Sequence, residues 1–249
     1  MLLHGAAIVL GTAALVLVSY GAGRWLLGPE DGTDRKELAG SVLFRIAALH
    51  GLILSLVFAQ QMGDYRELAR NVAEEASAVA DIYFDAARYG EGVRAALQPG
   101  LSAYAAAVIE DEWVRLGETG RMSDEAWARW GAAYEAVLDL VPQTPRQEAL
   151  RANMLARIHL VAEHRDARAD HSLAPIGAMF WAAAIAGVVA TALAYHVYAP
   201  TWRNLALMAL FASFTGLVLF FIHAFSNPYA APGALAPEAY ERLVVRELG

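Results

Sequence analysis

The stretch AGSVLFRIAALHGLILSLVFAQQ, residues 39–61, decides the fold, because an apolar helix of this length can cross the ~30 Å hydrocarbon core of a bilayer. From Asp64 onward the sequence is charged but keeps residues that favour helices. No proline follows until Pro99, and no glycine interrupts the residues between Gly63 and Gly90. The sequence therefore predicts one helix over about residues 39–89, roughly 75 Å long, that leaves the membrane and continues into water.

Three other apolar blocks are long enough to span a membrane. The first covers residues 5–28, and only His4 precedes its apolar run. A signal peptide would usually begin with Lys or Arg, so we expect this helix to be retained. The other two blocks, residues 173–199 and 204–225, are joined by so short a link that they must be antiparallel neighbours.

The composition supports a membrane protein with one water-exposed part. The chain is 57% hydrophobic and 18% charged, whereas about a quarter of the residues of an average soluble domain are charged. The acidic excess behind the net charge of −7 lies within residues 62–172. We predict an all-α protein in which four transmembrane helices, in two antiparallel pairs, flank a helical extramembrane domain. The predicted parts are a helix pair over residues 1–62, a helical domain over 63–172, a second helix pair over 173–227 and a tail over 228–249.

The charged region carries further helix signals. Residues 101–117 and 123–141 have apolar residues at helical spacing. Ser123, ahead of two acidic residues, is typical of a helix start, because its hydroxyl can accept a free amide proton and the acids suit the positive helix end. A further charged helix is expected over residues 146–170.

Several classes of function are excluded by what the sequence lacks. It has no cysteine, so disulfides, thiolate metal sites and cysteine nucleophiles are ruled out. An acidic domain without a basic stripe argues against nucleic-acid binding, which needs clustered Lys and Arg. The sequence contains no nucleotide-binding glycine loop and no H-E-x-x-H or G-x-S-x-G motif. We therefore expect no enzyme activity, no cofactor, no catalytic residue and no metal ligand.

Two ionisable residues, Arg45 and His50, fall inside the second predicted span. Such groups are costly in a bilayer and are therefore functional candidates. Each has a structural alternative: Arg45 is close enough to one membrane face to snorkel to the headgroups, and His50 could make a hydrogen bond inside the helix bundle.

Leu54 and Phe58 follow His50 at four-residue spacing, so the three share one face of the second helix over ~12 Å. Hydrophobic constrictions gate ion pathways by dewetting, and this stripe is our candidate pore lining. The alternative is ordinary packing against other membrane helices.

A cluster of histidines and acids near the end of the charged region is a weak metal-site candidate. His159 and Glu163 lie one turn apart, and His171 follows. No second helix supplies the matching Glu-x-x-His element of a carboxylate di-metal bundle, so a solvated charged face is the preferred interpretation. The acidic run 110–112 and the pair 74–75 are likewise interpreted as solvated or salt-bridged positions.

Several segments carry a resemblance to a known family. They are Leu49–Gly63 (LHGLILSLVFAQQMG), Asn71–Asp81 (NVAEEASAVAD), Tyr104 with Glu110, Glu112 and Trp113, and Phe225–Pro228 (FSNP). With this order of spans and helical domain, the chain resembles the bacterial bestrophin-like family of membrane proteins over nearly its whole length.

The resemblance implies a pentameric anion channel whose second helix lines the pore with a hydrophobic neck. The neck positions would fall on His50, Leu54 and Phe58. A histidine stands where that pattern expects an aliphatic residue, which puts permeation in question or makes it pH-sensitive.

Our leading hypothesis is thus an oligomeric membrane protein that acts as an anion channel. The alternative is an accessory or scaffolding subunit of a membrane complex, whose acidic domain binds a partner protein. In either case the lipid bilayer is the first partner, and a homo-oligomer is expected. The resemblance implies the bacterial inner membrane, and the positive-inside rule favours a cytoplasmic central domain.

Overall fold

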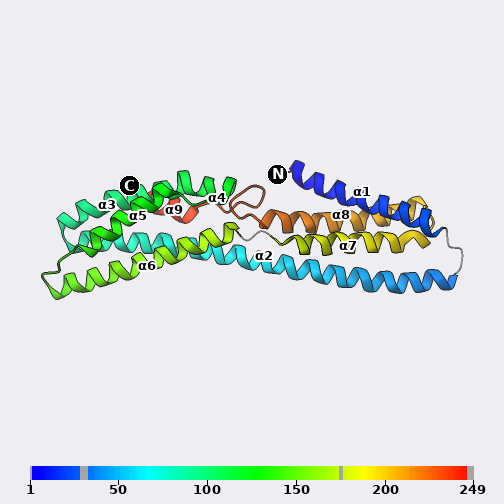
Figure 1. Ribbon diagram of the computed structural model, residues 1–249, viewed down its shortest axis with the longest axis horizontal. Helices are drawn as coiled ribbons and strands as arrows, with labels where there is room; N and C mark the ends of the chain where they lie inside the picture. Colours follow the sequence, from blue (N-terminus) through cyan, green and yellow to red (C-terminus); the bar gives the residue numbers. More distant parts are fainter. Residues whose placement is uncertain (1, 29–32, 174–175, 246–249) are drawn as a thin grey trace. The chain divides into compact units, whose positions relative to one another are not determined.

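The computed structural model describes residues 2–28, 33–173 and 176–245 (Figure 1). The regular elements in these ranges are all helices, as predicted. The chain divides into two compact units, and we describe each by itself. Unit 1 comprises residues 1–63 and 175–226, and unit 2 comprises residues 64–174 and 227–249.

Unit 1 contains the apolar helices. They are α1 (Leu2–Leu27), the first part of α2 (Thr33–Tyr89), α7 (Ala178–Ala194) and α8 (Trp202–Phe225). All four are long and apolar enough to cross a membrane, and most of their side chains are not buried within the subunit. The four predicted spans are therefore four apolar helices of membrane-spanning length, and side chains that face lipid need no protein cover.

In unit 1, α1 packs most closely against α8 and α7. Val16, Val188 and Met208 meet in the resulting core. Gly216 allows the close approach of α8, since a Cβ there would lie 2.8 Å from the Cα of Val9. Small residues permit such close contacts between membrane helices. The predicted pairing of helices in chain order is not confirmed, because the main contacts of α1 are with the third and fourth spans.

The turn between α7 and α8 is held by polar groups from α1. Tyr20 donates its hydroxyl to the carbonyl of Tyr198 at 2.8 Å. The Arg24 guanidinium donates to the carbonyls of His196 and Tyr198, each at 3.0 Å. These bonds satisfy carbonyls that the end of a helix leaves without intrahelical partners.

The helix α2 is unbroken from Thr33 to Tyr89, which confirms the single long helix predicted from the sequence. It contributes to both units, because the division between them falls after Gly63.

Unit 2 is a helical bundle with its own core. Besides the second part of α2 it contains α3 (Glu91–Ala107), the π-helical turn η1 (Val108–Glu112), α4 (Trp113–Thr119), α5 (Asp124–Leu138), α6 (Pro145–Leu173) and α9 (Glu238–Leu243). Its core includes large apolar side chains from all of the longer helices: Leu68, Val79, Ile82, Leu97, Leu101, Trp130, Val137, Met154 and Ile158.

The first of the helices predicted in unit 2 has different boundaries in the structure. The segment predicted as one helix over 101–117 begins at Glu91 and is interrupted by η1. Pro99 lies inside α3, where the buried Leu97 and Leu101 on either side anchor the helix in the core. The helix start at Ser123 is confirmed, since its hydroxyl accepts a hydrogen bond from the Ala126 amide at 3.2 Å.

Candidate functional site

The predicted pore stripe lines a cavity in unit 1. His50, Leu54 and Phe58 all border a space of about 560 Å³ between α2 and α8. The remaining lining residues are Ala47, Gly51 and Ser55 on α2, and Phe211, Phe214, Thr215, Leu217, Val218 and Phe221 on α8. The cavity is therefore almost entirely apolar, and it lies within the membrane-spanning part of both helices.

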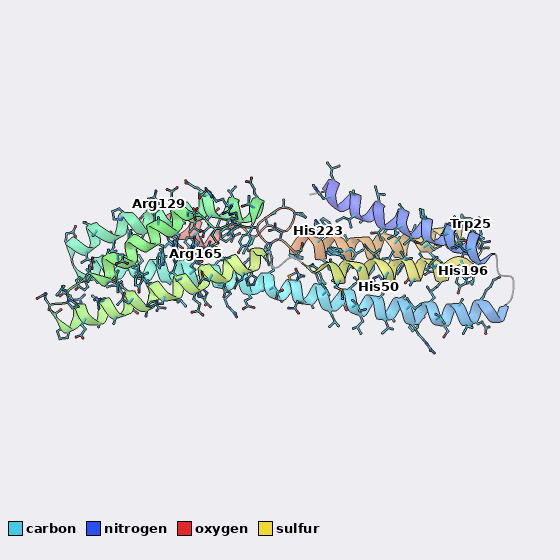
Figure 2. The ribbon with its side chains drawn as sticks, in the orientation of Figure 1. Trp25, His50, Arg129, Arg165, His196 and His223 are labelled. Carbon is cyan, nitrogen blue, oxygen red and sulfur yellow. The ribbon has the colours of Figure 1, made fainter. Side chains whose placement is uncertain are left out.

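His50 lies on α2 beside α7 (Figure 2). The residue is 5% exposed, and its ring packs so closely on Gly187 that a Cβ there would lie 2.6 Å from the Cδ2 atom. The Ala184 backbone on α7 hydrogen-bonds the imidazole. The Nε2 atom has no hydrogen-bond partner among the described residues.

Leu54 and Phe58 follow His50 on the same face of α2. Leu54 is buried against Ala184, Leu219 and Ile222. Phe58 is half-buried, and its ring centroid lies 6.5 Å from that of Phe221. The stripe therefore lines the α2 side of the cavity.

The rim of the cavity is open to the surroundings of the subunit. Phe214 is 66% exposed, Leu217 42% and Phe221 40%. The other face of α2 carries exposed large side chains as well, including Leu49, Leu52 and Leu56, and Arg45 is exposed. Both faces therefore carry apolar side chains that the described part of the chain leaves uncovered.

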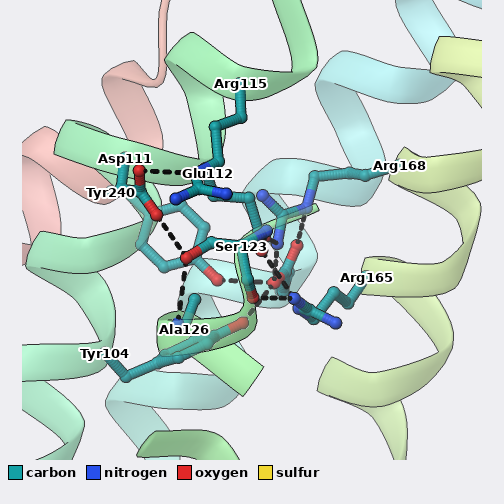
Figure 3. A network of polar contacts seen from close by, with 10 residues as sticks. Tyr104, Asp111, Glu112, Arg115, Ser123, Ala126, Arg165, Arg168 and Tyr240 are labelled. Carbon is teal, nitrogen blue, oxygen red and sulfur yellow. Dashed lines mark hydrogen bonds and ion pairs between the residues drawn. The ribbon is translucent and has the colours of Figure 1, made fainter. Parts of the chain in front are cut away.

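A second site, in unit 2, is a buried network of ion pairs (Figure 3). Arg168 on α6 is fully buried, and its Nη2 atom donates to Glu75 Oε1 at 2.9 Å and to Glu112 Oε1 at 2.8 Å. The Nε atom of Arg168 lies 2.9 Å from Glu75 Oε2. One guanidinium thus bridges carboxylates from α2 and from η1.

Arg165, one turn earlier on α6, completes the charge balance. Its Nη2 atom donates to Glu112 Oε2 at 2.6 Å and to the Ser123 carbonyl at 2.9 Å. The guanidinium also stacks on the ring of Trp127, 4.9 Å from its centroid. Two carboxylates and two guanidinium groups are therefore buried together with no net charge.

Tyrosine hydroxyls extend the network to other helices. Tyr104 on α3 donates to Glu75 Oε1 at 2.9 Å, and Tyr240 on α9 donates to the same atom at 2.7 Å. Tyr229 donates to the backbone carbonyl of Arg168 at 3.0 Å. The network joins α2, α3, η1, α6 and α9.

Burial and charge shift the titration of these groups. Burial raises the pKa of the Tyr104 hydroxyl well above its ordinary value, and the Glu75 carboxylate raises it further. Burial and the Glu75 carboxylate also raise the pKa of the Tyr240 hydroxyl. Burial alone would lower the pKa of the Arg168 guanidinium, but Glu75 and Glu112 more than reverse this effect and raise it. Arg168 therefore stays charged, and both tyrosines stay protonated, at neutral pH.

The π-helical turn η1 helps to place Glu112 in the core. A π turn adds a residue to the helical repeat, and the inserted turn separates neighbouring acids. Glu112 is fully buried on the network, while Asp111 is bonded to the Ser123 hydroxyl and lies 2.7 Å from Arg115. The Ser123 and Arg115 contacts lower the pKa of the Asp111 carboxyl.

The structure confirms the solvated face for His159 and Glu163, which are exposed, whereas other charges of these segments are salt-bridged in the core. Glu75, Glu112 and Arg168 are fully buried, and His164 and Arg165 are nearly so. The His159–His171 segment supplies cations to an ion network, and no group that could hold a metal ion occurs among the described residues. The physical reason is that partners on other helices neutralise these charges.

Sequence reasoning missed Arg165, Arg168, Tyr229 and Tyr240. A signal for the two arginines was present on α6. Met154, Ile158 and Val161 occupy core positions at three- and four-residue spacing, and Arg165 and Arg168 continue that stripe. The period of that stripe places both arginines on the core side of α6, but it does not show whether carboxylates will meet them there.

The four apolar spans and the helical unit with its neutral ion network define an α-helical, multi-span membrane protein. Within that class, the sequence matches the family described as the Bestrophin-like domain over residues 10–240, and the chain belongs to this family. No curated protein matches the sequence.

Solved structures have the same fold at low sequence identity. A bacterial bestrophin homolog from Klebsiella pneumoniae, solved as a mutant, is 13% identical with a TM-score of 0.64, covering 98% of this chain and 97% of the other. A second mutant of that homolog is 12% identical with a TM-score of 0.64, covering 97% and 96%. A structure described as a mutant membrane protein is 15% identical with a TM-score of 0.60, covering 97% of each chain.

Four of the residues that carried the family resemblance in unit 2 lie at the ion network. Glu75 belongs to the Asn71–Asp81 segment, and Tyr104 and Glu112 contact Glu75 or Arg168 directly. Trp113 lies under Arg168, with 5.7 Å between its ring centroid and the guanidinium carbon. These motif residues have a shared structural role, because they surround one buried cation.

Proposed function

We propose that this protein is an anion channel formed by several copies of the chain. The main observation behind this proposal is that His50, Leu54 and Phe58 line one apolar cavity within the membrane-spanning unit of a bestrophin-like protein. An apolar constriction excludes water when it is narrow and admits hydrated ions when it widens. The stripe on α2 would supply this hydrophobic neck.

The exposed apolar surface supports assembly into a closed homo-oligomer such as a pentamer. The cavity rim and the outer face of α2 both present large apolar side chains, which either lipid or neighbouring subunits can cover. Copies arranged around an axis would bring their α2 helices together. We place the complex in a bacterial inner membrane with unit 2 in the cytoplasm.

Anion flux into liposomes that contain the purified protein tests the neck. Leu54→Ala combined with Phe58→Ala removes bulk from the constriction, and we expect anion flux to rise. The matched control is Leu49→Ala combined with Leu56→Ala on the exposed face of α2, which should leave flux near that of the wild type. Flux that does not respond to the first pair would contradict the assignment of the neck.

The cysteine-free sequence gives a second, independent test. A single cysteine at residue 54 would react with a water-soluble, anionic thiol reagent if the stripe faces an aqueous pathway. A cysteine at residue 56 serves as the comparison on the other face of α2. Faster modification at residue 56 than at residue 54 would assign the pathway to the other face.

The subunit count distinguishes a channel from an accessory protein. Native mass spectrometry of the solubilised complex should give a closed homo-oligomer. A stoichiometric complex with a different protein would favour the scaffolding function instead.

A further inference from the structure

One side of the cavity between α2 and α8 is a groove of small residues. Ala47, Gly51 and Ser55 follow one another at four-residue spacing on α2 and therefore share one face. Small residues on a membrane helix usually mark a place where another helix packs closely. At Gly51, however, a Cβ would meet no atom of the described residues within 4 Å. The groove is therefore open space inside the membrane-spanning unit.

The opposite side of the cavity is aromatic and opens sideways. Phe211, Phe214 and Phe221 on α8 line it, and the exposed fractions of Phe214 and Phe221 are 66% and 40%. Because these residues lie in the middle of a membrane-spanning helix, the bilayer around the opening consists of hydrocarbon chains. An apolar molecule can therefore reach the cavity without crossing water.

The polar side chains of the lining make few demands on an occupant. Of the twelve lining residues, only His50, Ser55 and Thr215 have polar side chains. His50 and Thr215 are each 5% exposed, and the Ser55 hydroxyl donates to the Leu52 carbonyl at 2.9 Å. Apolar cavities stay free of water and take up apolar molecules, and one of about 150 Å³ already holds benzene. The lining therefore favours an uncharged hydrocarbon occupant.

The dimensions of the cavity distinguish a hydrocarbon chain from a helix. Its lining runs from Ala47 to Phe58 on α2, about 16 Å along the helix axis. A volume of about 560 Å³ divided by this length gives a mean cross-section of roughly 35 Å². An extended hydrocarbon chain needs roughly 16 Å², since carbon atoms in contact lie about 4 Å apart, whereas a helix about 10 Å wide needs roughly 80 Å². The cavity thus admits a chain but no helix.

The depth of the cavity agrees with one leaflet of a bilayer. The hydrocarbon core is about 30 Å thick, so the chains of one leaflet extend over about 15 Å, close to the length of the lining. Within the apolar stretch 39–61, the lining residues 47–58 lie mostly in the half that ends at Gly63. A lipid of the leaflet at that end could place one chain along the groove.

We infer that the cavity between α2 and α8 is a binding site for one acyl chain of a phospholipid, taken from the leaflet at the Gly63 end of α2. The binding itself does not depend on channel activity. In the proposed channel, a bound chain would keep water away from Leu54 and Phe58, and this consequence does rest on the proposed function.

Photolabelling in lipid nanodiscs tests the site directly. The nanodiscs contain phosphatidylethanolamine and phosphatidylglycerol with a trace of phosphatidylcholine that carries a diazirine on one acyl chain. After irradiation, mass spectrometry locates the label on the protein. We expect it on lining residues within 47–58 and 211–221, well above the level at Leu49, Leu52 and Leu56, which are exposed but lie outside the lining.

Gly51→Leu is the test variant, because its side chain fills the groove. Labelling of the lining should fall about tenfold, the effect of roughly two fewer methylene groups in the cavity. Gly11→Leu is the matched control, since Gly11 on α1 is also exposed and a Cβ there meets no described atom within 4 Å. It should leave the labelling unchanged. Ser55→Leu fills the groove at another point and replaces Gly51→Leu if circular dichroism shows that the latter is not folded.

Equal labelling of the lining and of Leu49, Leu52 and Leu56 would overturn the site, because the label would then report only the lipid that surrounds any membrane protein. Equal labelling in the Gly51→Leu and Gly11→Leu variants would overturn it as well. A lining that stays unlabelled would assign the space to side chains of a second copy. If the labelling follows the expected pattern but the wild type carries no anion flux, the channel function fails and the acyl-chain site stands.

Discussion

The imidazole of His50 on α2 lies against Gly187 on α7, where a side chain at residue 187 would have its Cβ 2.6 Å from the His50 Cδ2 atom. The His50 ring therefore fills the space that an alanine methyl group at residue 187 would need. The fit explains how a histidine is accommodated where the family resemblance implies an aliphatic residue.

Gly187→Ala should destabilise unit 1 by about 1–3 kcal/mol, the usual cost of overpacking. The measurement is thermal unfolding of the protein in detergent. His50→Ala should relieve the clash, so the double variant should be more stable than the sum of the two single effects predicts. Gly51→Ala is the control, since a Cβ at residue 51 meets nothing within 4 Å. Equal effects of the two glycine substitutions would contradict the contact.

Arg168→Met should cost unit 2 about 3–5 kcal/mol, because it leaves Glu75 and Glu112 buried without their shared cation. Urea unfolding followed by circular dichroism measures the loss. Arg129→Met is the control, since it breaks an exposed pair with Glu125 and should have little effect. A small effect of Arg168→Met would show that the carboxylates are protonated or hydrated in the folded protein.

Unit 2 should lose stability when the pH rises above about 10, where tyrosine in an unfolded chain ionises. Burial raises the pKa of Tyr104, Tyr229 and Tyr240 in the folded state. A raised folded pKa means that stability is fully present below the unfolded value and is lost as the pH rises through the folded value. Absorbance at 295 nm and circular dichroism, recorded together, should show these three hydroxyls ionising only as the helices unfold. In Tyr240→Phe the dependence on pH should be weaker, and ionisation of all tyrosines before unfolding would refute this explanation.

Gly117→Ala should loosen residues 227–245 without removing a charged group of the ion network. A Cβ at residue 117 would lie 2.6 Å from the Tyr229 carbonyl oxygen, and a backbone atom cannot rotate away as a side chain can. Hydrogen exchange in residues 227–245 should therefore increase, while exchange in α6 should remain slow. Gly92→Ala has open space around it and provides the control. Unchanged hydrogen exchange in residues 227–245 would mean that the packing of this segment tolerates a shift at Tyr229.

The membrane helices could be predicted because each signal is local. A bilayer requires about twenty apolar residues in a row, so the four blocks are visible without any tertiary information. The helix from Thr33 to Tyr89 is visible for a related reason, since the sequence between Gly63 and Gly90 contains no helix breaker. The Ser123 cap is likewise local, because the hydroxyl and the amide it accepts are three residues apart.

The α2 side of the candidate site could be predicted from the sequence in the same way. His50, Leu54 and Phe58 share a face by helical period alone, and the structure brings all three to one cavity. The other wall of that cavity, with Phe211, Phe214 and Phe221, could not be predicted. Helix period shows which residues share a face, but it does not show which helix that face will meet.

The sequence by itself determined the class of the protein, its four spans, its long α2 and its helical water-exposed region, because hydrophobic length and helix-breaking residues act within a few turns. Only the tertiary structure decided which charges are buried. Glu75 and Arg168 are 93 residues apart, and Glu75 and Tyr240 are 165 apart. A carboxylate is stable in a core only when distant segments deliver its partners, so no local pattern distinguishes it from a carboxylate in water.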